Sequence, residues 1–168
     1  MKFSVGQNVA VTPDAAVAAY GTPAFYENGN GRPTGDITIV EVVGHEDSGE
    51  RTRIEVRYKF TGSVSSAVRA VIDPAKISWI TRTDIDKVSR AATFTVLPDN
   101  YADRLDCNGT FVFTEGATGP ASCVVTVAGD LRVHVMLVGK TVEQIIVSGL
   151  RAYLTAEIET LPDFTKGG

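Results

Sequence analysis

The residue types that most often carry out catalysis are few in this chain and form no known catalytic pattern. There are two histidines, His45 and His134, and two cysteines, Cys107 and Cys123. The sequence contains no G-x-S-x-G elbow, no phosphate-binding G-x-x-x-x-G-K-[ST] loop and no H-E-x-x-H pair. The pattern places His134 on the polar face of a strand and His45 in a turn, where we expect both to be exposed. We therefore assign no catalytic residue and expect neither a metal nor a cofactor.

Three other side chains offer a different route to proton transfer. Tyr58, Tyr153 and an inward-facing acid such as Glu41 have the chemistry to move protons at an enolisable substrate. Their spacing shows no paired acid and base. An enzyme of the cyclase or hydratase type is therefore an alternative hypothesis.

A larger set of aromatic and hydroxyl-bearing side chains indicates binding of a small molecule. A mostly apolar pocket with a few polar groups is the usual form of such a site. Gly149 adds to this pattern because it removes a side chain from the middle of an apolar helix face. The alternative is that these side chains simply fill a core. The candidate ligand-binding residues are Phe25, Tyr58, Phe60, Trp79, Thr81, Thr83, Phe94, Phe111, Phe113, Ile146, Gly149, Leu150 and Tyr153.

The last third of the chain must position many of these residues. Residues 130–138 alternate apolar and polar side chains, which predicts a half-buried strand, and a long helix is expected to begin at Gly139. Glu157 and Glu159 lie near its C-terminus, where the helix dipole disfavours acids, so packing must stabilise this helix. Pro162 is expected to end it. The apolar stripe of the helix consists of Val142, Ile145, Ile146, Gly149, Leu150, Tyr153, Leu154 and Ile158.

The rest of the chain is predicted to be mostly β-structure. Thr12-Pro13 and Thr22-Pro23 are helix start signals that predict two short helices after a first strand. Residues 65–72 have helical spacing, and residues 28–35 form an exposed loop. The strands are predicted at residues 3–11, 37–43, 53–60, 77–86, 91–98, 106–114 and 122–138.

Length and charge limit the possible functions. A chain of 168 residues fits one domain, residues 1–168, and its net charge of −4 without a basic cluster argues against nucleic-acid binding. No apolar segment approaches the ~18 residues of a membrane span and no signal sequence is visible, so we expect a cytoplasmic protein. We predict that both cysteines are unpaired, because the expected hairpin register separates them.

The order of these elements resembles the START-like superfamily, also called polyketide-cyclase-like, SRPBCC or helix-grip. The final run from Leu131 through the helix is similar to an actinobacterial family of unknown function, with one glycine missing from the turn Val138-Gly139-Lys140. Phe25-Tyr26-Glu27 stands where that family tends to carry tryptophan and arginine. The resemblance implies an α+β helix-grip fold: a curved antiparallel sheet of about seven strands wrapped on a long C-terminal helix, with two short helices after the first strand.

The resemblance names no substrate. Our leading hypothesis is binding or carriage of a hydrophobic small molecule of the lipid, polyketide or isoprenoid class between sheet and helix. The portal is expected among residues 25–35, residues 65–72 and the first half of the helix. The alternatives are a cyclase or hydratase and a structural or interaction protein with a filled cavity. A cavity of ~300 Å³ or more favours the first two, whereas a filled interior favours the third. The sequence names no protein partner.

Overall fold

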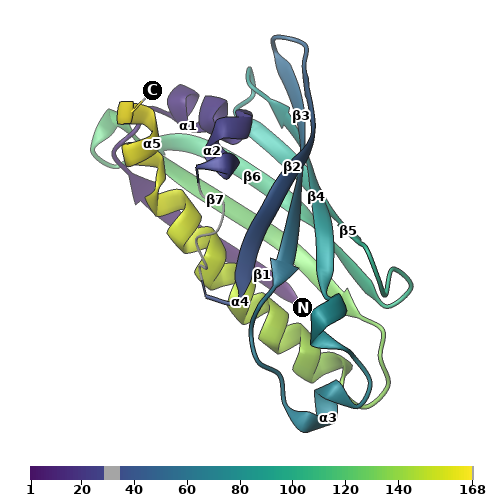
Figure 1. Ribbon diagram of the computed structural model, residues 1–168. Coiled ribbons are helices and arrows are strands. Elements are labelled where there is room, and N and C mark those ends of the chain that lie inside the picture. Colours follow the sequence, from purple (N-terminus) through teal and green to yellow (C-terminus); the bar gives the residue numbers. More distant parts are fainter. Residues whose placement is uncertain (29–34, 168) are drawn as a thin grey trace.

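A single curved antiparallel sheet wraps around the long helix α4 (Figure 1). The computed structural model describes residues 1–28 and 35–167. The seven strands lie in the order β1-β7-β6-β5-β4-β3-β2, so each strand from β2 onward pairs with its neighbour in sequence and β1 closes against β7. This is the predicted α+β helix-grip architecture. The strands are β1 (Lys2–Val9), β2 (Ile37–Asp47), β3 (Arg51–Phe60), β4 (Ser78–Asp86), β5 (Ala91–Pro98), β6 (Leu105–Gly116) and β7 (Gly119–Val133).

Hydroxyl caps begin two of the short helices, one of them at the predicted Thr12, whereas the Thr22 hydroxyl does not cap α2. The Thr12 hydroxyl accepts a hydrogen bond from the Ala15 amide at 3.2 Å, and the Ser65 hydroxyl accepts one from the Val68 amide at 3.4 Å. In Figure 1, α1, α2 and α5 gather at one end of α4 and α3 lies at the other. The helices are α1 (Pro13–Tyr20), α2 (Pro23–Glu27), α3 (Ser66–Arg69), the 3₁₀ turn η1 (Pro74–Lys76), α4 (Gly139–Glu159) and α5 (Leu161–Gly167).

Helix α5 was not expected from the sequence. The prediction that the long helix stops before Pro162 is confirmed, because α4 ends at Glu159. A new helix then begins at Leu161. Pro162 is tolerated in its first turn, because backbone amides there have no hydrogen-bond partner within the helix and the amide that proline lacks is therefore not needed. Leu161 is fully buried and anchors this last segment to the core.

The inward faces of the strands follow the predicted alternation. Ile54, Val56, Tyr58 and Phe60 of β3 are all buried. Trp79 of β4 faces inward beside Tyr58, as expected, but it is only partly buried. The prediction that Trp79 faces inward is therefore confirmed.

Two glycines face each other at the centre of the sheet. Gly109 of β6 and Gly129 of β7 are register partners, and on either side of them lie Phe94 of β5 and Phe3 of β1. A Cβ at Gly129 would lie 2.6 Å from the Phe3 ring, and one at Gly109 would lie 2.7 Å from the Phe94 ring. Both rings therefore lean over strands that carry no side chain at this point. We call Gly109 and Gly129 the glycine floor.

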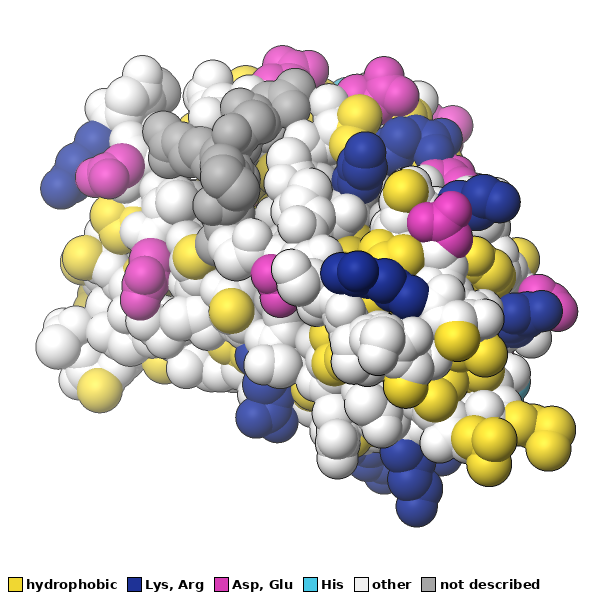
Figure 2. Space-filling model, turned by 60° about the horizontal axis from the view of Figure 1, so that its bottom comes forward, with side chains coloured by type: hydrophobic (Ala, Val, Ile, Leu, Met, Phe, Trp, Pro, Cys, Tyr) yellow, Lys and Arg dark blue, Asp and Glu magenta, His cyan; other side chains and the backbone are white. Residues whose placement is uncertain are grey.

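The last strand is shorter than predicted. β7 ends at Val133, and residues 134–138 turn away from the sheet instead of continuing it. The His134 amide donates to the Arg104 carbonyl at 2.7 Å, and the Gly139 amide already donates to the Val135 carbonyl at 3.0 Å, so the chain is committed to the helix. Leu137, with φ +71°, is fully exposed. Figure 2 looks at this end of the molecule and shows apolar side chains exposed beside lysine and arginine side chains.

Both cysteines are free and buried. Cys107 lies opposite Leu131 and Cys123 opposite Glu115, so the register separates them as predicted. No helix among the described residues is both long and apolar enough to cross a membrane.

Candidate functional site

Between the sheet and α4, the described residues enclose two small cavities that share a wall. Each has a volume of about 50 Å³. The shared wall consists of Ile37, Trp79, Val96, Cys107 and Leu150. Both volumes are well below the ~300 Å³ that we set as the sign of a ready-made ligand site. Among the described residues the interior is therefore nearly filled, which by our criterion favours the third alternative, a structural or interaction protein, unless the space can enlarge. The two cavities differ in chemistry.

The first cavity, which we call the tyrosine cavity, is polar at one end. Four tyrosines from four different elements line it, together with a single acid, Glu157. Phe3 and Phe94 also line it, so the glycine floor lies beneath it. The tyrosines are Tyr20 of α1, Tyr26 of α2, Tyr58 of β3 and Tyr153 of α4.

Glu157 stands on the buried face of α4. Its position in the helix is one turn after Tyr153 and Leu154 and next to Ile158, all of which are buried. The Tyr153 hydroxyl donates a hydrogen bond of 2.5 Å to Glu157 Oε2. Burial raises the pKa of the Glu157 carboxyl to about 7, although the hydroxyls of Tyr153 and Tyr20 act in the opposite direction. At neutral pH this carboxyl is close to half ionised.

The tyrosines around Glu157 remain protonated. Burial, and then the negative charge of Glu157, raise the pKa values of Tyr20, Tyr26, Tyr58 and Tyr153 above their ordinary value. The Tyr26 hydroxyl donates to the Tyr20 carbonyl at 2.9 Å. The Tyr20 hydroxyl itself, buried with the side chain at 2% exposure, has no hydrogen-bond partner among the described residues. An unpaired buried hydroxyl typically costs about 1–3 kcal/mol, so it marks a place where a partner is missing.

The second cavity, which we call the apolar cavity, lies on the other side of Trp79 and Leu150. Gly149 contributes no side chain here, and the nearest atom to a Cβ at this position, outside its own helix and among the described residues, is Asp36 Cβ at 3.8 Å. Close backbone approach therefore does not explain this glycine, and open space does. The residues that line only this cavity are Phe60, Ile77, Ser78, Pro98, Asn100, Tyr101, Leu105, Leu131, Ile146 and Gly149.

Most of the candidate binding residues line one cavity or the other. Tyr58, Trp79, Thr81, Thr83, Phe94, Phe111, Leu150 and Tyr153 line the tyrosine cavity, and Phe60, Trp79, Ile146, Gly149 and Leu150 line the apolar cavity. Phe25 and Phe113 line neither. Their rings pack against Tyr20 at centroid distances of 5.1 and 5.5 Å, so they support the wall from behind.

The expectation of an inward-facing Glu41 is wrong. Its side chain is 59% exposed and lies 3.6 Å from Arg57. A β-bulge between Ile39 and Glu41 shifts the alternation of β2 by one residue and turns this acid to the solvent. The acid that does face inward is Glu157, which the sequence pattern had placed only at the unfavourable end of the helix dipole.

Trp79 forms the partition between the two cavities. It stacks on Tyr58 at a centroid distance of 5.8 Å, and Tyr153 meets Tyr58 edge to face at 5.5 Å. Trp79 and Leu150 are both only partly buried. A movement of these two side chains would join the cavities into one.

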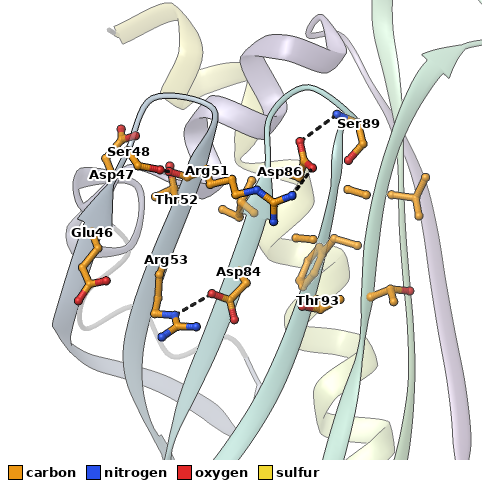
Figure 3. A pocket seen from close by; sticks show the side chains of 16 residues that line it. Glu46, Asp47, Ser48, Arg51, Thr52, Arg53, Asp84, Asp86, Ser89 and Thr93 are labelled. Atoms are coloured by element: carbon orange, nitrogen blue, oxygen red, sulfur yellow. Dashed lines mark hydrogen bonds and ion pairs between the residues drawn. The ribbon is translucent and has the colours of Figure 1, made fainter.

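A much larger hollow of about 710 Å³ lies outside this interior, across the ends of the β2–β3 and β4–β5 hairpins (Figure 3). Both of its arginines are already paired: Arg53 lies 2.7 Å from Asp84, and Arg51 lies 3.4 Å from Asp86. Figure 3 shows these pairs bridging neighbouring strands. Two further acids, Glu46 and Asp47, leave its lining with an excess of negative charge. Because its arginines are already paired, this open surface is the weaker candidate for a site.

The histidines and cysteines offer no competing site. His45 lies in β2, not in a turn, and its Nε2 lies 3.0 Å from the Gly21 carbonyl oxygen. His134 lies 2.9 Å from Asp106 on the surface. Burial raises the pKa of the Cys107 thiol to about 12, which makes it a poor nucleophile. Within residues 1–28 and 35–167, no three His, Cys, Asp or Glu side chains gather as metal ligands would.

The expected portal is described only in part. Residues 29–34 of the predicted 28–35 loop lie outside the described residues. Val68 and Ile72, at and just after α3, are buried and pack with Val142 of α4, so this segment covers the first half of the helix.

A curved antiparallel sheet wrapped around one long helix, with enclosed space between them, gives this chain a helix-grip α+β fold. Solved structures share the fold. TTHA0849 from Thermus thermophilus is 13% identical over 99% of this chain and 98% of its own, with a TM-score of 0.66. Norcoclaurine synthase from Thalictrum flavum is 19% identical over 96% of this chain and 85% of its own, with a TM-score of 0.61. The Zhui aromatase/cyclase from Streptomyces sp. R1128 is 14% identical over 94% and 91%, with a TM-score of 0.56.

The family is established by sequence. The model described as "Protein of unknown function (DUF2505)" matches residues 4–164, and the chain belongs to that family. No curated protein matches the chain.

Proposed function

We propose that this protein binds a hydrophobic small molecule between the sheet and α4. The observation that carries the proposal is the interior itself, which has a polar end at Glu157, an apolar end at Gly149, and a shared wall between them that includes the partly buried Trp79 and Leu150. An amphipathic molecule of the lipid, polyketide or isoprenoid class matches this arrangement. The similar structures support the proposal, because a synthase and an aromatase/cyclase are among them.

Binding must move the partition. A cavity of ~10–15 Å³ holds one water molecule and one of about 150 Å³ holds benzene, so a cavity of about 50 Å³ is too small for an organic ligand. Displacing Trp79 and Leu150 joins the two cavities and enlarges the space. Ligand entry should therefore be coupled to a change in the surroundings of Trp79.

Trp79 makes this proposal directly measurable, because it is the only tryptophan in the chain. Titration with N-phenyl-1-naphthylamine, an uncharged dye that fluoresces in apolar surroundings, should quench Trp79 emission and raise dye emission together. Gly149→Leu, which places a side chain in the apolar cavity, should weaken dye binding at least fivefold. Ser148→Leu adds the same side chain at the exposed neighbouring position and should bind the dye as the unmodified protein does.

Two results would contradict the proposal. The first is an unmodified protein that does not bind the dye, which would favour a structural or interaction protein with a filled interior. The second is equal dye binding by Gly149→Leu and Ser148→Leu, which would place the dye elsewhere. Circular dichroism of both variants shows that the fold is retained.

A second candidate function, acid–base catalysis on the bound molecule, is favoured by the Glu157–Tyr153 pair. A carboxyl with a pKa of about 7 can both accept and return a proton near neutral pH. Incubation with phenylacetone in D₂O tests this: deuterium uptake at the carbon next to the carbonyl, measured by mass spectrometry, should exceed that without protein and disappear in Glu157→Gln. Uptake that is the same in both proteins would exclude Glu157 as the catalytic base.

A further inference from the structure

The tyrosine cavity holds a negative charge that nothing in its described wall balances. Among the described residues that line it, Glu157 is the only charged side chain, and there is no lysine, arginine or histidine. The hydrogen bond from Tyr153 is the one that this carboxylate receives among the described residues. A buried carboxylate is strongly destabilised unless a cation or several hydrogen bonds accompany it. The cavity therefore lacks a positive partner.

The groups that face Glu157 from the surrounding elements are all neutral near neutral pH. They are the hydroxyls of Tyr20, Tyr26, Tyr58 and Tyr153, whose pKa values are raised, and the Cys107 thiol, with a pKa of about 12. None of them supplies a positive charge. Glu157 is thus the one group here whose charge changes between pH 6 and pH 9.

The Tyr20 hydroxyl, which lies near enough to Glu157 to lower the pKa of that carboxyl, is a second sign of a missing partner. It is buried, lines the same cavity as Glu157 and has no hydrogen-bond partner among the described residues. A phenol oxygen can accept a hydrogen bond as well as donate one. The aromatic walls of the cavity also favour a positively charged partner, since the faces of aromatic rings attract cations.

These observations select the chemistry of the ligand. An anion would be repelled by Glu157, and a neutral alcohol would satisfy Tyr20 but leave the carboxylate unbalanced. An ammonium group has three hydrogen-bond donors and a positive charge, so it can balance the charge of the carboxylate and donate hydrogen bonds to both the carboxylate and the Tyr20 oxygen. A single carboxylate without further ligands does not form a metal site.

We infer that the tyrosine cavity receives the ammonium group of a primary amine with an apolar body. The ammonium group lies between Glu157 and Tyr20, and the apolar body extends past Trp79 and Leu150 toward Gly149. This inference rests on the proposed binding function and specifies the class of ligand.

The matched probes 2-phenylethylamine and 2-phenylethanol test the inference, since they differ only in the ammonium or hydroxyl group. Binding is followed by Trp79 fluorescence and calorimetry at pH 6.0 and pH 8.5. The amine should bind at least tenfold more tightly than the alcohol at pH 8.5. The affinity for the amine should be about tenfold lower at pH 6.0, because about nine-tenths of the Glu157 carboxyl groups carry a proton there. The affinity for the alcohol should be the same at both pH values.

Variants identify the residue responsible. Glu157→Gln should remove the preference for the amine and its pH dependence, and Tyr20→Phe should weaken amine binding while keeping the pH dependence. Glu159→Gln is the matched control, because this acid is exposed and accepts a hydrogen bond from Gln7 at 2.9 Å. The comparison of amine and alcohol binding at the two pH values tests the inference in the unmodified protein, even if a variant fails to fold.

The outcomes separate the inference from the function on which it rests. Equal binding of amine and alcohol at both pH values would overturn amine recognition and leave the binding function intact. Binding of neither probe, together with no binding of the uncharged dye, would overturn both. A preference for the amine that survives in Glu157→Gln would also overturn the inference, because the charge would then come from elsewhere.

Discussion

Replacing Glu157 by glutamine should change how stability depends on pH. In the folded protein the pKa of this carboxyl is raised from 4.5 to about 7 by burial. A raised acid pKa means that the folded state holds the proton more tightly than the unfolded chain does. The stabilisation is therefore fully present below pH 4.5 and is lost as the pH rises through about 7. At 1.36 kcal/mol per pKa unit, the whole effect amounts to about 3 kcal/mol of unfolding free energy.

The assay is urea unfolding, followed by far-ultraviolet circular dichroism, of both proteins between pH 5 and pH 8.5. Glutamine keeps the shape of the protonated acid and cannot ionise. The variant should therefore gain about 2.5 kcal/mol of unfolding free energy relative to the unmodified protein across this range. Acids with lowered pKa values, such as Asp86 and Asp130, lose their contribution only as the pH falls through values below 3.8, and they are common to both proteins. Parallel pH profiles for the two proteins would refute the reasoning.

Three further predictions follow from the packing. Gly149→Ala should raise the unfolding free energy by up to about 1 kcal/mol, because the added Cβ meets only Asp36 Cβ at 3.8 Å and alanine favours the helix; a loss of stability in urea would contradict this. Gly109→Ala should destabilise the protein by about 2 kcal/mol or more in the same assay, since its Cβ would collide with the Ala128 carbonyl and the Phe94 ring. An unchanged urea midpoint would contradict this and show that the sheet relaxes around the added methyl group. Cys107, which is buried and protonated, should react with Ellman's reagent only as fast as the protein unfolds, and immediate reaction would refute its burial.

The order of elements could be predicted because each carries a local signal. β5 has the predicted bounds, and α1 and α2 begin immediately after the predicted threonine–proline starts. The inward faces of β3 and β4 follow from the two-residue period of a strand, which tertiary contacts leave unchanged. Five of the thirteen candidate binding residues, Tyr58, Phe60, Trp79, Thr81 and Thr83, came from those faces, and all five line a cavity.

The remaining differences between prediction and structure have local physical causes that cannot be read from the periodicity of apolar residues. A bulge in β2 reverses the side to which Glu41 points, and hydrogen bonds at His134 and Gly139 end β7 before the alternation ends. Glu157 was missed because it was considered only as a charge at the C-terminal end of the helix dipole and was assigned to neither face of the helix. Its spacing was the available signal, since it falls on the same stripe as Leu154 and Ile158.

The glycine floor also determines which parts of the interior are free to vary. A cavity can be widened by shortening the side chains around it, but Gly109 and Gly129 have no atoms left to remove. It can be narrowed by lengthening them, but Phe3, Phe94 and the neighbouring backbone leave no room for even one methyl group. The floor is therefore fixed in both directions. A change in what the interior holds has to be made elsewhere, in its side walls or in its roof at Ile146, Gly149, Leu150 and Tyr153 of α4.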